Sequence, residues 1–192
     1  DCYNVIAKMR FNQKDFKSAI SYANLALENM NINQDQDFPF KHDVHGLLGR
    51  IYLKKLNYNK AVFHYKEALR YCGDIYKRSK ETHTAGLAKS FALSNPTAAK
   101  KLLEKSLQSV KGNQDILMSN SLITAYIEAS EIYLTMNDSI QTQLYLDLAF
   151  ELINKTGNTP DINKVYAYKT LAKLHQKNLK KHKDYLIKAT ES

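Results

Sequence analysis

The sequence of 192 residues is short of the residues and motifs that mark membrane-spanning, disulfide-linked or catalytic proteins. Its two cysteines, Cys2 and Cys72, form no CxxC motif, and they indicate neither an oxidising nor a reducing compartment. We expect both to be small buried side chains. With three prolines, six glycines and no run of 18 apolar residues, the chain offers no candidate membrane span.

Motifs for common enzyme chemistry are also missing. The sequence has no GxxxxGK[ST], GxGxxG, HExxH or GxSxG pattern, and no convergent acid, base and nucleophile. A segment at 33–44 begins like a calcium loop but lacks its glycine and its bidentate glutamate. His42 and His45 share a helix face, with His64 expected opposite, yet no cysteine or carboxylate completes a tetrahedral set. We therefore predict a non-enzyme that holds no metal and no cofactor.

What the chain does contain is an internal repeat. Five times a large or apolar residue is followed by a small one, at intervals of 42, 39, 42 and 42 residues. The pairs are Ile6-Ala7, Leu48-Gly49, Leu87-Ala88, Ala129-Ser130 and Leu171-Ala172. A period near 40 with helical spacing inside each unit is typical of stacked helix hairpins, which bury their apolar faces only against neighbouring hairpins.

Further markers follow each pair 12 or 11 residues after its small member, and again seven residues later. The first set is Ala19, Ala61, Ala99, Thr142 and Asp184, and the second is Ala26, Ala68, Ser106, Ala149 and Glu191. We expect these positions to lie where two helices touch. The second unit predicts helices over 39–55 and 59–72. Asn95-Pro96 and Thr159-Pro160 each predict a helix start, since proline suits the first turn.

The second unit resembles the tetratricopeptide repeat signature at Leu48-Gly49, Tyr52, Tyr58, Ala61, Tyr65 and Ala68-Leu69. The first unit matches it at Ile6-Ala7, Phe16, Ala19, Ala23 and Ala26-Leu27. The period exceeds the standard one by about eight residues, as in the longer variety seen in bacterial regulators and kinesin light chains. The resemblance implies an all-α, right-handed superhelix (solenoid) of about five hairpins. We expect one domain, 1–192, with repeats near 1–36, 37–78, 79–113, 114–158 and 159–192.

Charge is distributed unevenly along the repeats. Residues 41–111 contain 15 basic and five acidic side chains, a net charge of +10, and residues 161–192 contain eight and three, a net charge of +5. Residues 112–160 contain one basic and six acidic side chains, a net charge of −5. Such blocks on a solenoid would steer an acidic partner toward the positive segments, although helix faces also carry charge without any partner.

The resemblance also implies where a partner would bind. In tetratricopeptide proteins the residue after the small residue of each first helix usually faces the inner groove. Here these residues are Lys8, Arg50, Lys89, Glu131 and Lys173. Neighbours on the same face by helical spacing are Asn4, Asn12, Lys54, Lys169 and Lys177, and they supply donors for carboxylates and backbone carbonyls.

These patterns favour a non-catalytic protein-protein interaction scaffold that binds an acidic peptide or protein segment in its concave groove. One alternative is the sensory or regulatory input domain of a larger bacterial signalling or transcription-regulating protein. Another is a non-specific nucleic-acid binder, which four arginines against 24 lysines disfavour, because base readout and stacking use arginine.

The ends of the sequence suggest a fragment of a longer protein. Asp1 enters the first predicted helix without a methionine, and no hairpin follows to cover Tyr185, Leu186 and Ile187. We expect exposed apolar surface there, or self-association through terminal repeats. We expect a soluble chain, and the compartment stays open between cytoplasm and bacterial periplasm.

Overall fold

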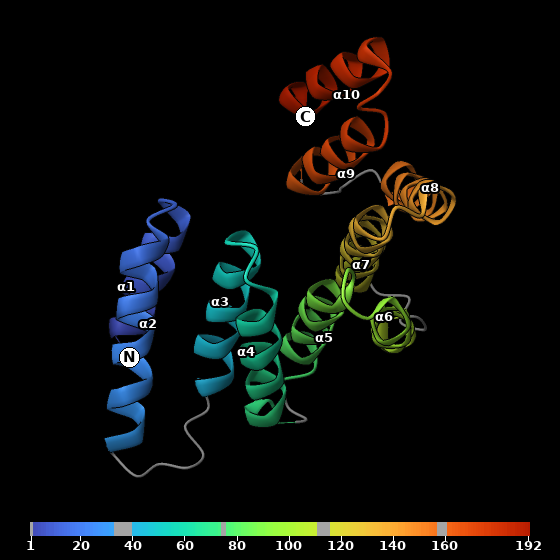
Figure 1. Ribbon diagram of the computed structural model, residues 1–192. Helices are drawn as coiled ribbons and strands as arrows, with labels where there is room; N and C mark the ends of the chain where they lie inside the picture. Colours follow the sequence, from blue (N-terminus) through green and yellow to red (C-terminus); the bar gives the residue numbers. More distant parts are fainter. Residues whose placement is uncertain (1, 33–39, 74–75, 111–115, 157–160) are drawn as a thin grey trace. The chain divides into compact units, whose positions relative to one another are not determined.

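The computed structural model describes residues 2–32, 40–73, 76–110, 116–156 and 161–192, and these residues form ten α-helices and no strand (Figure 1). The predicted all-α fold is therefore confirmed. The helices are α1 (Cys2–Asn12), α2 (Phe16–Ile32), α3 (Lys41–Lys54), α4 (Tyr58–Tyr71), α5 (Lys77–Phe91), α6 (Pro96–Val110), α7 (Ile116–Thr135), α8 (Ser139–Thr156), α9 (Asp161–Leu174) and α10 (Leu179–Glu191).

Contacts between helices divide the chain into two compact units, Asp1–Phe91 and Ala92–Ser192. In the first unit α1 packs on α2 and α3 on α4, and α5 continues the series by packing on α4. The first helices also contact one another, α1 with α3 and α3 with α5. In the second unit α7 packs on α8 and α9 on α10, and α7 contacts α9. The prediction of one domain with five repeats stays a prediction.

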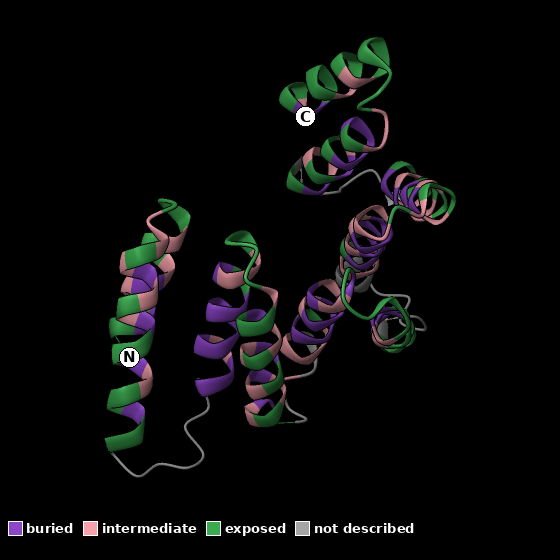
Figure 2. Cartoon of the chain, in the orientation of Figure 1, coloured by how far each residue is buried: buried purple, intermediate pink, exposed green. Residues whose placement is uncertain are grey.

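The small residues predicted at helix contacts are buried in all five first helices. They are Ala7, Gly49, Ala88, Ser130 and Ala172. The markers of the first four second helices are buried as well, as predicted: Ala19, Ala26, Ala61, Ala68, Ala99, Ser106, Thr142 and Ala149. Figure 2 shows buried residues concentrated along one side of most helices. Small side chains let neighbouring backbones approach closely. The residues that recur at the repeat period are therefore those at the helix contacts.

The fifth second helix departs from the predicted register. Asp184 and Glu191 are exposed, whereas Ala189 is buried in α10. Charged carboxylates are rarely buried without partners, so α10 turns another residue toward α9. Of the three apolar residues predicted to be exposed, Leu186 and Ile187 are 41% and 53% accessible, whereas Tyr185 is half-buried and stacks on His175.

Every second helix begins with an aspartate or asparagine cap. A side-chain oxygen of Asp15, Asn57, Asn95, Asp138 and Asn178 accepts a hydrogen bond from the backbone N–H three residues later. This confirms the start predicted at Asn95-Pro96. The predicted 39–55 and 59–72 become α3 and α4, while Pro39 and Thr159-Pro160 lie outside the described residues.

Three of the hairpin turns share an unusual backbone. Lys14, Leu56 and Asn137 have φ values of 62°, 57° and 59°, and each immediately precedes a cap residue. The cap residue's own N–H reaches back to a carbonyl five residues earlier: Asp15 to Arg10, Asn57 to Tyr52 and Asp138 to Tyr133. This is the bond pattern of a Schellman motif, normally completed by glycine.

No helix among the described residues is long and apolar enough to cross a bilayer.

Candidate functional site

The first unit brings two predicted groove residues together on one carboxylate. Nδ2 of Asn4 donates a hydrogen bond of 3.0 Å to Oδ2 of Asp43, and the ammonium of Lys8 forms an ion pair with the same oxygen. Both contacts join α1 to α3. Asn4 is buried, and the Lys8 side chain keeps 42% of its accessible surface.

Asp43 was not assigned a role by the sequence. Burial alone would raise the pKa of its carboxyl group, but hydrogen bonds from Lys8 and Asn4 outweigh that effect and lower the pKa below its usual value. Asp43 therefore offsets part of the positive charge predicted at this surface. One signal could have found it: Asp43 follows Asn4 by 39 residues, close to the repeat period.

Arg50 stays exposed on α3, with its guanidinium carbon 5.2 Å from the centre of the Phe11 ring on α1. Asn12 is the last residue of α1 and Lys54 is the last residue of α3, and both side chains are exposed. Lys89 is half-buried on α5. Helix α1 contacts α3, and α3 contacts α5. Each of these helices therefore carries one basic residue directly after its buried small residue: Lys8, Arg50 and Lys89.

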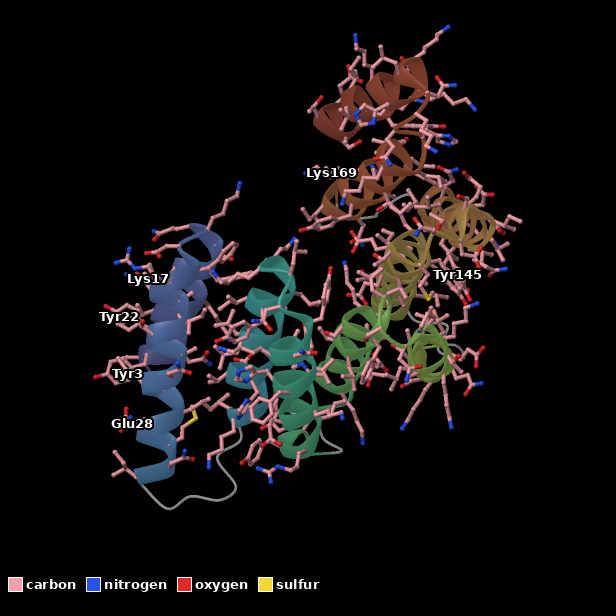
Figure 3. The ribbon with its side chains drawn as sticks, viewed as in Figure 1. Tyr3, Lys17, Tyr22, Glu28, Tyr145 and Lys169 are labelled. Carbon is pink, nitrogen blue, oxygen red and sulfur yellow. The ribbon has the colours of Figure 1, made fainter. Side chains whose placement is uncertain are left out.

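The remaining predicted residues belong to the second unit. Glu131 is half-buried on α7, and Lys169 and Lys173 lie on α9, where Figure 3 labels Lys169. Lys173 is exposed, and Lys177 is exposed just after α9. The continuity of one stripe through all ten predicted residues stays a prediction.

The histidines pair differently from the predicted arrangement. His45 does face His64, with 3.1 Å between their Nδ1 atoms, whereas Nδ1 of His42 lies 3.2 Å from Nε2 of His83 on α5. In each pair one ring nitrogen donates and the other accepts. Burial lowers the pKa of His42, and it lowers the pKa values of His45, His64 and His83 to about 4. The sequence reasoning did not consider His83, which follows His42 by 41 residues.

Cys72 lies beside the second of these pairs. It is buried at the C-cap of α4, and its sulfur, one ring nitrogen of His42 and one of His83 lie within 4.8 Å of one another. Cys2, in contrast, is exposed, so the expectation that both cysteines are buried is wrong for Cys2.

No protein-family model matches the sequence, and no curated protein matches it. Among solved structures, the chain is similar to BtubC (BKLC) from P. vanneervenii, with a TM-score of 0.68. The match covers 98% of this chain and 77% of that chain, at 18% sequence identity. At this identity the likeness concerns the fold alone.

Proposed function

We propose that the chain is a tetratricopeptide-like solenoid, a non-catalytic interaction scaffold that binds an acidic peptide or protein segment. The binding surface we propose is the basic surface, defined as Lys8, Arg50 and Lys89 on α1, α3 and α5. One observation carries the proposal: these three helices contact in series, and each basic residue directly follows a buried small residue.

The shared register explains how three separate side chains could act together. A residue next to a buried one in a helix is rotated by about 100°, so equal offsets from the contact place side chains at equivalent positions on each helix. Lys8, Arg50 and Lys89 would then present a row of donors along the first unit. Carboxylates of an extended segment can accept from such a row.

Asp43 makes the basic residues of this surface unequal in their availability to an acidic partner. Because Lys8 is already paired with Asp43, an acidic partner must compete for Lys8. Arg50 is exposed and its guanidinium group lies over the face of the Phe11 ring, a contact that leaves the N–H donors at the edge of the group able to bind a carboxylate. Arg50 should therefore contribute more to partner binding than Lys8.

The test reverses Arg50 and Lys89 together to glutamate and measures the affinity of fluorescent peptides of alternating glutamate and glycine. We expect binding to weaken by about tenfold or more, since two attractions of up to about 1 kcal/mol each become repulsions. Helicity and melting temperature should be nearly unchanged.

The matched control is the pair Lys17→Glu and Lys66→Glu, which changes net charge equally but lies on the second helices. Both lysines are exposed, and Figure 3 shows Lys17 pointing away from α3. Equal weakening by the two double variants would mean that total charge alone attracts the peptide. Failure of the parent chain to bind it better than a glutamine-glycine peptide would also contradict the proposal.

A further inference from the structure

Three side chains able to bind a metal converge in the first unit, each from a different helix. His42 lies in the first turn of α3, Cys72 caps the end of α4, and His83 lies in α5. Their accessible fractions are 5%, 6% and 6%. One ligand atom of each lies within 4.8 Å of the other two. The chain places these residues 30 and 11 positions apart, so only the packing of α3, α4 and α5 assembles the cluster.

The distances fit a tetrahedral centre. With Zn–N bonds of about 2.0–2.1 Å and a Zn–S bond of about 2.3 Å, tetrahedral geometry separates two nitrogens by about 3.3 Å and nitrogen from sulfur by about 3.6 Å. The facing nitrogens of His42 and His83 are already 3.2 Å apart. The sulfur of Cys72 needs to approach by little more than about 1 Å, which a side-chain rotation can provide.

The types of ligand also suit a metal. An imidazole coordinates through the lone pair of a ring nitrogen, and a cysteine coordinates as its thiolate. Imidazole and thiolate ligands together select zinc over magnesium or calcium, which prefer oxygen. Asp43, next to His42, supplies a negative charge close to the cluster.

We propose that His42, Cys72 and His83 form a Zn²⁺ site that joins α3, α4 and α5, with water as the fourth ligand. Binding deprotonates the Cys72 thiol, so one proton leaves for each zinc bound. The facing nitrogen that carries the hydrogen of the His42–His83 bond becomes a ligand only when its ring changes tautomer, which moves that hydrogen to the ring's other nitrogen and releases no proton. Zinc stays divalent, and no oxidant or reductant takes part. The site shares no residue with the basic surface, and its test does not depend on an acidic partner.

The first experiment titrates the full chain, purified without metal, with Co²⁺ as a spectroscopic substitute for Zn²⁺. We expect one equivalent to produce a sulfur-to-cobalt charge-transfer band and intense visible bands of a tetrahedral centre, which Zn²⁺ then removes. Calorimetry of Zn²⁺ binding in two buffers should report release of about one proton. A chain that binds no cobalt, or binds it without the sulfur band, would overturn the proposal.

Two matched pairs of variants locate the site. Cys72→Ser and His83→Gln should each weaken Zn²⁺ binding at least about 100-fold, because even the loss of an outer-shell partner costs 10- to 100-fold. Cys2→Ser changes the exposed cysteine, and His64→Gln breaks the other histidine pair, so both should keep parental affinity. A comparable loss in either control would place the metal elsewhere.

A third measurement uses only the parent chain, in case Cys72→Ser or His83→Gln does not fold. Alkylation followed by mass spectrometry reports each cysteine separately. Zn²⁺ should slow the modification of Cys72 by tenfold or more and leave that of Cys2 unchanged. Equal rates at Cys72 with and without Zn²⁺ would show that its thiol is not a ligand, and that its contacts are structural, such as the one with the Tyr76 carbonyl 3.5 Å away.

Discussion

Tyr65 on α4 shows how single atoms set the packing of the first unit. Its side chain is 2% accessible, and its ring lies against Gly49 of α3 and Gly86 of α5. A Cβ at residue 49 would stand 2.9 Å from the ring, and one at residue 86 would stand 2.3 Å from it. Both distances are below normal contact, so the two glycines make room for one aromatic side chain. The predicted close helix contact at Gly49 is thereby confirmed.

We expect Gly86→Ala to lower the free energy of unfolding by about 1–3 kcal/mol, because overpacking outweighs the gain of about 1 kcal/mol in helix propensity. Gly49→Ala should cost less, since its clash is milder. Gly73→Ala is the control, as no atom lies within 4 Å of its added Cβ. Urea unfolding followed by circular dichroism measures all three. If Gly86→Ala matched Gly73→Ala, the packing of Tyr65 against residue 86 would be wrong.

The His45–His64 pair makes stability sensitive to acid. Burial lowers both pKa values from about 6.5 in the unfolded chain to about 4 in the folded chain. Charge repulsion adds to the effect: His64 itself, then Arg70 and Lys41, disfavour the charged form of His45, and Lys60 disfavours that of His64. Between about pH 4 and 6.5 the unfolded chain binds more protons, so the free energy of unfolding falls as pH falls through this window.

Replacing one member of this pair should remove part of that pH dependence. We expect His64→Gln to lose less stability than the parent between about pH 6.5 and 4, measured by thermal melting in a buffer series. Parallel curves for His64→Gln and the parent would mean that these histidines do not control acid stability.

At the residue scale, sequence reasoning found the contacts that repeat and missed those that do not. The small residues of the first helices recur at a fixed period, and all are buried as predicted. His83 and Cys72 have no counterpart of the same residue type in the other units, so a search for repeated residue types did not find them. Their partners lie on other helices, at distances that depend on how the hairpins stack.

At the scale of elements, the hairpin turn combines a cap with a residue of positive φ. The cap was predictable, because aspartate and asparagine accept hydrogen bonds from the free N–H groups of a first turn. The left-handed residue was not, because Lys14 and Leu56 are not residues that favour this conformation. Packing of both helices on their neighbours holds the turn in place despite its local cost.

Leu56→Gly tests that account of the turn. Leu56 is 70% accessible, so its side chain contributes little packing, and glycine would remove a left-handed strain of about 1–2 kcal/mol. Greater freedom of glycine in the unfolded chain offsets about 0.5–1 kcal/mol of this gain. We expect a net stabilisation of up to about 1.5 kcal/mol, measured by urea unfolding.

The matched control is Glu28→Gly, at an exposed position in the interior of α2. Glycine has no left-handed strain to relieve there, so the variant should lose about 0.5–1 kcal/mol through helix propensity alone. Destabilisation by Leu56→Gly of the same size would show that the turn gains nothing from glycine and that the Leu56 side chain contributes to packing.

At the scale of the whole molecule, the repeat period predicted the all-α fold, because spacing alone requires helices that bury small residues against one another. The period says nothing about partners. Charge is the property that acts over the whole chain, and the net charge of +9 attracts any polyanion, whatever its sequence. A partner of the basic surface must therefore be distinguished from general attraction.

Duplex DNA provides that distinction. Lysine acts on phosphate mainly as a point charge, and four arginines leave few groups suited to bidentate base contacts. We expect DNA binding to be independent of sequence and to weaken by orders of magnitude between about 50 and 200 mM salt, as released counterions require. The two double variants, Arg50→Glu with Lys89→Glu and Lys17→Glu with Lys66→Glu, should weaken it equally, because they remove equal charge. Fluorescence anisotropy with two unrelated duplexes measures these effects, and a preference for one duplex that persists at about 200 mM salt would favour a nucleic-acid binder over a protein scaffold.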